Sequence, residues 1–155
     1  MKPGISEAVL SLLKKKVQCL PDIGKICIIT YDEMALKKEL KYDRKADEII
    51  GLVNLDRKLP IACNQALVFM AKGICLKWKQ PISFHFSNNA AGADSLCAIL
   101  MHLLRRLFEI GLKPVAAVCD QGSCNRALYR KLDVNVSKPF FEVKRMSHKS
   151  LDYHH

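Results

Sequence analysis

The sequence predicts an α/β fold in which helices pack against a mixed sheet. Two uncharged runs, ICIIT at 26–30 and VAAVC at 115–119, are typical of buried strands, and the first is mostly β-branched. Between them, residues 93–110 repeat apolar side chains at the i, i+3, i+4 and i+7 spacing of an amphipathic helix. A helical connection of this kind lets the second strand return parallel to an earlier one.

An aspartate follows each of these two strands. Asp32 sits at the carboxyl end of the first run, and Asp120 ends the second run in front of a Gly-containing turn. If the strands are neighbours, the two carboxylates converge in the crevice where open α/β sheets bind ligands, and they repel unless a cation lies between them. Magnesium is the expected cation, because it prefers oxygen ligands and can align the oxygens of a phosphodiester. Taken singly, each aspartate is more commonly a cap, of a turn for Asp32 and of a helix starting near Ser123 for Asp120.

The composition indicates one globular domain inside the cell. The chain has 155 residues, of which 50% are hydrophobic, and this excludes a disordered tail. A net charge of +10 and a pI near 9.4 fit a polyanion such as nucleic acid, and they fit a lysine-rich surface equally well. Neither a signal peptide nor an apolar run long enough for a membrane span is recognisable. The seven cysteines form no CxxC pair, which favours reduced thiols over a zinc site.

The remaining segments predict further helices and strands along the chain. We expect, in order, a helix from a Ser6 cap through Val17, a loop at 20–24, a polar turn at 41–47, strands at 48–55, 65–74 and 81–87, a helix at 123–132, and a last strand at 134–143. Residues 65–74 are also compatible with a helical turn. Pro139 restricts the last strand to an edge or a late start.

Four collinear segments resemble the ribonuclease H-like domain of P-element-type transposases, including the THAP-domain proteins derived from them. These segments are DEM at 32–34, ALVFMAKG at 66–73, WKQPISFHFS at 78–87 and VCDQGSCN at 118–125. The resemblance covers about residues 3–143, and several blocks in one order are more specific than any single short motif. It implies a ribonuclease H-like mixed sheet with helices, truncated before the last helix of the fold.

The resemblance also implies a set of metal-binding acids and a nuclear location. The family is a group of nuclear DNA-transposition enzymes in which two aspartates and a later glutamate hold two divalent ions, Mg²⁺ or Mn²⁺. Asp32 and Asp120 match the two aspartates, and they are the pair that strand order alone brings together. The later glutamate, the DPPHL-like block and the GTP-binding insertion have no counterpart here, so GTP is not expected. Glu142 and Asp152 are poor substitutes, because neither lies on a helix predicted to face the aspartates.

We therefore expect a partial domain with incomplete catalytic machinery. Its organisation is predicted as an N-terminal helix and loop at 1–24, a partial transposase domain at 25–143 and a divergent tail at 144–155. Weak, non-specific DNA binding is expected from the basic surface, including Lys37, Lys38 and the group Lys72, Lys77 and Lys79. Three functions stay open: an active strand transferase, a nucleic-acid-binding or interaction remnant, and a relic without function.

Overall fold

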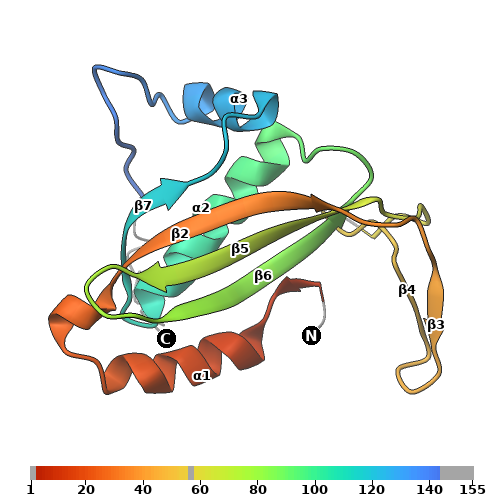
Figure 1. Cartoon of the computed structure of the whole chain (residues 1–155), viewed down its shortest axis with the longest axis horizontal. Coiled ribbons are helices and arrows are strands. Elements are labelled where there is room, and N and C mark those ends of the chain that lie inside the picture. Colours follow the sequence, from red (N-terminus) through yellow and green to blue (C-terminus); the bar gives the residue numbers. More distant parts are fainter. Residues whose placement is uncertain (1–2, 56–57, 144–155) are drawn as a thin grey trace, which may run out of the picture.

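A five-stranded mixed sheet with three helices forms the body of the molecule (Figure 1), as described by a computed structural model for residues 3–55 and 58–143. The elements are β1 (Gly4–Ile5), α1 (Glu7–Gln18), the 3₁₀ turn η1 (Asp22–Lys25), β2 (Ile26–Ala35), β3 (Lys41–Asp43), β4 (Glu48–Ile50), β5 (Gln65–Gly73), β6 (Lys79–Ser87), α2 (Ala93–Glu109), β7 (Lys113–Val118) and α3 (Ser123–Lys131). The sheet order is β1-β6-β5-β2-β7, and β3 and β4 form a separate hairpin.

The central strand β2 determines the topology. It pairs antiparallel with β5 along its whole length and parallel with β7 from Ile26 to Thr30. The chain passes from β6 through α2 before it reaches β7, so the predicted helical crossover and the parallel return are confirmed. This mixed sheet with its helices confirms the predicted α/β architecture.

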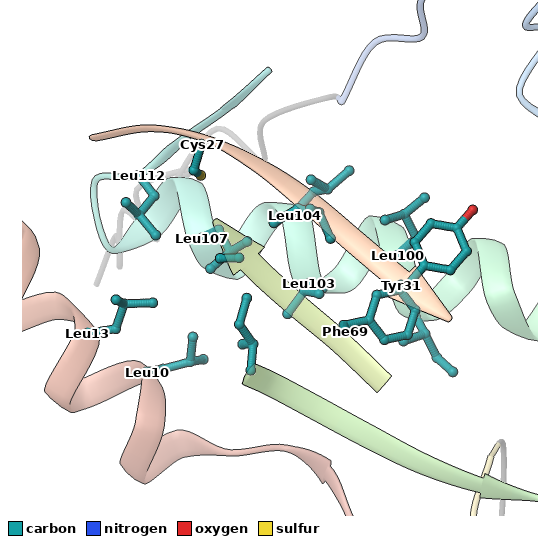
Figure 2. Close-up of a cluster of buried hydrophobic side chains, with 14 of the residues drawn as sticks. Leu10, Leu13, Cys27, Tyr31, Phe69, Leu100, Leu103, Leu104, Leu107 and Leu112 are labelled. Atoms are coloured by element: carbon teal, nitrogen blue, oxygen red, sulfur yellow. The ribbon is translucent and has the colours of Figure 1, made fainter. Parts of the chain in front are cut away.

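One face of the sheet carries the hydrophobic core (Figure 2). Cys27, Ile29 and Tyr31 of β2 alternate onto this face, where leucines of α1 and α2 cover them. Each fully buried leucine contributes roughly 2 kcal/mol to folding. The N-terminal helix belongs to the same core, since Leu10 and Leu13 are buried in it. Ser6 caps this helix as predicted, because its hydroxyl accepts a hydrogen bond from the backbone N–H of Val9 at 3.4 Å.

The opposite face of the sheet is only partly covered. The expectation that residues 26–30 are buried on both sides is wrong, because Ile26, Ile28 and Thr30 are half-buried. Further along this face Met34 is 56% exposed, and Val118 at the end of β7 is 47% exposed. The buried side chains of the three helices all join the cluster that contains Tyr31. The uncharged sequence of the strand therefore makes both of its faces apolar, but only one of these faces is buried.

Two predicted strands differ from the structure for local reasons. The strand expected at 48–55 ends at Ile50, because Gly51 adopts φ +98° and a Cβ there would lie 2.3 Å from the carbonyl oxygen of Glu39. Its three residues pair with β3, which lies inside the segment predicted as a polar turn. No strand forms among the described residues at 134–143, where Asn135 and Lys138 close a turn through their backbone groups.

The remaining helices and strands lie close to their predicted positions. The segment at 65–74 is a strand, since β5 pairs with both β2 and β6, and the alternative of a helical turn is wrong. The helix predicted at 123–132 corresponds to α3. Residues 144–155 lie outside the described part of the chain. None of the helices in the described part is long and apolar enough to cross a membrane.

Candidate functional site

The two aspartates lie where β2 and β7 separate. The parallel pairing ends at Thr30 and Val118, after which β7 stops and the chain turns into α3, whereas β2 continues beside β5 to Ala35. Asp32 is thus inside β2 and not at its end, which corrects the sequence-based expectation. The strand persists through the two acids because β5 supplies it with a continuous antiparallel partner on the other side.

Both aspartates line one cleft of about 250 Å³. We call it the acid cleft: its walls are Tyr31, Asp32 and Glu33 of β2, Asp120 of the β7–α3 loop, and the first turn of α3 at 123–125. The two acids predicted from strand order therefore line the same cleft. Asp32 and Asp120 are both exposed, so their charges are hydrated.

Asp120 is held by the start of α3. Its Oδ1 accepts hydrogen bonds from the backbone N–H of Gly122 at 3.0 Å and from Nδ2 of Asn125 at 2.6 Å. The N-cap of α3 is Gly122, which has no side chain to cap the helix, so Asp120 does not occupy the capping position that the alternative interpretation gave it. Among the described residues, no hydrogen bond or ion pair engages Oδ2 of Asp120.

Asp32 and Glu33 are adjacent on β2, and their side chains make different hydrogen bonds. The Oδ1 atom of Asp32 accepts a hydrogen bond from the backbone N–H of Glu33 at 2.8 Å, and its Oδ2 has no bond within the described part of the chain. Glu33 lies on the opposite face of β2, where its Oε1 accepts a hydrogen bond from the backbone N–H of Ala91 at 2.7 Å. This contact ties β2 to the loop that leads into α2. Glu33 therefore fixes one wall of the acid cleft.

A buried polar cluster lies beside Asp120. Sγ of Cys119 and the hydroxyl oxygen of Tyr129 are 2.7 Å apart. The hydroxyl of Tyr31 is buried in the same region and has no hydrogen-bond partner among the described residues. Burial first, and then the neighbouring Cys119, Tyr129 and Asp120, raise the pKa of Tyr31 far above its ordinary value. Burial and Cys119 likewise raise the pKa of Tyr129 to about 12, so both phenols stay protonated at neutral pH.

The acid cleft fits one hard cation. Two exposed carboxylates, each with an unengaged oxygen, are a sufficient protein contribution for Mg²⁺ or Mn²⁺, because such ions retain several waters. Among the described residues, no group of three or more His, Cys, Asp or Glu side chains is arranged to hold a metal ion. The residues present therefore suit a single ion held by two carboxylates, and they do not supply a second ligand set.

The lysines expected to contact DNA fall at opposite ends of the sheet. Lys37 and Lys38 follow β2 just beyond the two acids and are exposed. Lys77 and Lys79 lie at the β5–β6 turn, next to the start of β2, where Gly73 pairs with Cys27. Lys37 and Lys38 are the pair that follows the two acids along the chain.

Comparison with known proteins defines the family. Residues 1–133 match the family described as TNP-like, RNase H N-terminal domain. The chain belongs to this family. The match spans α1, the whole sheet, α2 and α3, and so includes every wall of the acid cleft.

Two curated transposases are similar to this RNase H N-terminal domain. The chain is 28% identical over 141 residues to the "Transposable element P transposase" of Drosophila melanogaster, covering 91% of this chain and 16% of that protein. It is 25% identical over 140 residues to the human "DNA transposase THAP9", covering 86% of this chain and 15% of that protein. The chain thus spans about a sixth of the length of these relatives.

A solved structure shares the fold. The chain superposes on a protein of the "Drosophila P element transposase strand transfer complex" with a TM-score of 0.71 and 27% identity, covering 92% of this chain and 28% of that one. The resemblance to P-element-type transposases is confirmed by this similarity, the two relatives and the family match.

Sequence reasoning missed several residues of the RNase H N-terminal domain that border the acid cleft. Glu33 stands beside Asp32 in DEM, and Asn125 lies five residues after Asp120, within the first turn of a predicted helix. Either could have been suspected from these positions. Tyr31 has no such signal, because a tyrosine in a strand is ordinarily a core residue.

Proposed function

We propose that this chain is a DNA-binding part of a transposase catalytic domain in which Asp32 and Asp120 hold one Mg²⁺ or Mn²⁺ ion. The observation that carries the proposal is that both acids line a single cleft at the point where two parallel strands separate. Crevices at this position are where open α/β sheets bind ligands. The names of the relatives support DNA as the partner.

The chain's own residues prepare the two carboxylates for a cation. Asn125 and Gly122 hold Oδ1 of Asp120, and the N–H of Glu33 holds Oδ1 of Asp32, so each second oxygen is available. Such outer hydrogen bonds fix the direction in which a ligand faces its metal. A bound divalent ion would supply charge stabilisation and alignment of phosphate oxygens.

We propose further that the chain by itself does not cut or join DNA. Two-metal phosphoryl transfer needs ligands for both ions. Glu33, the third carboxylate in the cleft, accepts a hydrogen bond from the Ala91 N–H, and no group of three or more His, Cys, Asp or Glu side chains among the described residues is arranged to hold a metal ion. An active strand transferase would need the missing acid from another source. We expect a nuclear location from the family resemblance.

One experiment tests both parts of this proposal. The purified protein is incubated with supercoiled and transposon-end DNA in Mn²⁺, beside the Asp32→Asn protein, and binding and nicking are measured across a salt series. We expect binding that collapses with salt, because phosphate contacts release counterions, and we expect no nicking. Nicking by the wild type that disappears in the mutant would refute the claim of inactivity.

Charge variants locate the bound DNA. The double variant Lys37→Glu, Lys38→Glu is compared with Lys77→Glu, Lys79→Glu, which changes the net charge equally at the far end of the sheet. Stronger loss of binding in the first variant is expected if DNA enters the acid cleft. Equal losses would mean that binding is a property of net charge alone.

A second candidate function is a non-catalytic interaction module. It is favoured by the partly covered face of the sheet, where Met34 and Val118 are exposed. Exposed apolar patches of this kind mark contact surfaces in soluble proteins. A chain that binds neither DNA nor Mn²⁺ but associates through this face would support this alternative.

A further inference from the structure

Tyr31 is a buried residue of the acid cleft whose hydroxyl lacks a partner. Its ring stacks on Phe69 with the centroids 5.1 Å apart, and the side chain belongs to the hydrophobic core with a relative exposure of 4%. The hydroxyl makes no hydrogen bond with any described residue. Figure 2 shows it at the edge of the cluster, pointing away from the leucines. A buried hydroxyl without a partner destabilises a fold, so its presence calls for an explanation.

The groups nearest this hydroxyl belong to the segment that carries Asp120. After burial, Cys119 contributes most to the raised pKa of Tyr31, as a polar neighbour and by its charge, followed by the charges of Tyr129 and Asp120. The Cys119 thiol nevertheless does not meet hydrogen-bond geometry with the Tyr31 hydroxyl. Cys119 and Tyr129 are already paired with each other. Asp120 uses Oδ1 for its bonds to the start of α3, and its Oδ2 has no donor among the described residues. An unused donor and an unused acceptor thus border the same cleft.

A purely structural role would not need the oxygen. Phenylalanine has the same ring, would stack on Phe69 in the same way and would remove the unpaired polar atom from the core. Several buried polar atoms of the described residues lack a partner, and two of them, the Tyr31 hydroxyl and Oε1 of Gln65, belong to residues that line the acid cleft. Local violations of this kind concentrate at functional sites.

We infer that Tyr31 is a positioning residue for Asp120, whose carboxylate receives a hydrogen bond from the Tyr31 hydroxyl in the cation-bound protein. The inference rests on the proposed function, since it takes Asp120 as a cation ligand. Asp120 is exposed and lies in a loop, and its Oδ2 can accept the hydrogen bond while Oδ1 keeps its bonds to Gly122 and Asn125. Tyr31 itself does not contact the ion.

The test compares two tyrosine-to-phenylalanine variants on either side of Cys119. Tyr31→Phe removes the hydroxyl beside the acid cleft. Tyr129→Phe removes the hydroxyl that pairs with Cys119, and its ring borders a separate apolar cavity between α2, β7 and α3. For each protein, Mn²⁺ affinity is measured by calorimetry, and the melting temperature is measured without metal.

We expect Tyr31→Phe to bind Mn²⁺ about 10-fold more weakly, the lower end of the range for losing an outer hydrogen bond at a metal ligand. Its metal-free melting temperature should be equal to or above that of the wild type, which a merely structural hydroxyl would not allow. Tyr129→Phe should retain the wild-type Mn²⁺ affinity.

Each other result overturns the inference in a recognisable way. Wild-type affinity in Tyr31→Phe, with binding lost in Asp120→Asn, would remove the positioning role and leave the proposed cation site intact. A lower melting temperature in Tyr31→Phe with unchanged affinity would assign the hydroxyl to the core, paired with Cys119. Absence of Mn²⁺ binding in the wild type would refute the proposed function and, with it, any role for Tyr31 in positioning a ligand.

Discussion

At the scale of single residues, the side chain of Asp120 is held by more hydrogen bonds than the side chain of Asp32. Two donors from the start of α3 fix its Oδ1, whereas Asp32 has one donor from the adjacent residue of its own strand. Asn125 contributes the shortest of these contacts, at 2.6 Å. The orientation of Asp120 thus depends on a side chain in the first turn of α3.

Replacing Asn125 should weaken the cation site more than the fold. Asn125→Ala removes the Nδ2 donor to Asp120, and we expect about 10-fold weaker Mn²⁺ binding by calorimetry, in line with other outer-shell losses. Ser123→Ala, in the same turn, is the control. An unchanged affinity in Asn125→Ala would show that the Gly122 N–H alone orients Asp120.

At the scale of the elements, an ion pair joins α1 to α2. Both carboxylate oxygens of Glu7 accept hydrogen bonds from Arg106, from Nη1 and Nη2, each at 2.7 Å. The hydrogen bonds and charge of Arg106 lower the pKa of Glu7 below its ordinary value of 4.5. The bridge connects the first turn of one helix to the last turns of the other, at the edge of the core.

This pairing predicts a pH-dependent contribution to stability. A carboxyl whose pKa is lowered by folding stabilises the protein above its unfolded pKa, and the contribution is lost as pH falls through the folded value. Glu7→Gln should therefore lower the melting temperature slightly near pH 7 and have no effect once the pH is well below 4.5. A difference between the two proteins that persists in acid would mean that the effect arises from packing.

The sequence predicts helices and strands well where the apolar periodicity is strong. It predicts them less well where a single residue determines where an element ends. The apolar repeat of 93–110 and the uncharged runs at 26–30 and 115–119 locate α2, β2 and β7, and Asp32 and Asp120 line one cleft where the two parallel strands separate. Gly51 ends β4 through its positive φ, which is a tertiary property of that loop. The contacts of Glu33 with Ala91 span 58 residues, so local patterns could not reveal them.

The whole molecule has one well-covered face and one that is not. Leu10, Leu103 and Leu107 are buried on the core side, whereas Met34 and Val118 are largely exposed on the other. β7 is the last strand of the sheet among the described residues, so its outer edge is also unpaired there. Surfaces of this kind favour association and lower the stability of an isolated domain.

We therefore expect the isolated chain to bind an apolar dye and to be marginally stable. Met34→Lys and Val118→Lys together should reduce dye binding and self-association with little change in melting temperature, because both side chains are already exposed. Leu12→Lys is the control, since Leu12 is 67% exposed and belongs to α1 and not to this face of the sheet. A cooperative melt of a monomer without dye binding would contradict this expectation.

The central claim is that Asp32 and Asp120 share one divalent ion, and calorimetric titration with Mn²⁺ tests it most directly. The wild type should bind one ion per chain, and both Asp32→Asn and Asp120→Asn should weaken binding strongly while keeping the wild-type melting temperature without metal, because both side chains are exposed. Absence of metal-dependent heat in the wild type would contradict the claim. So would wild-type affinity in either mutant.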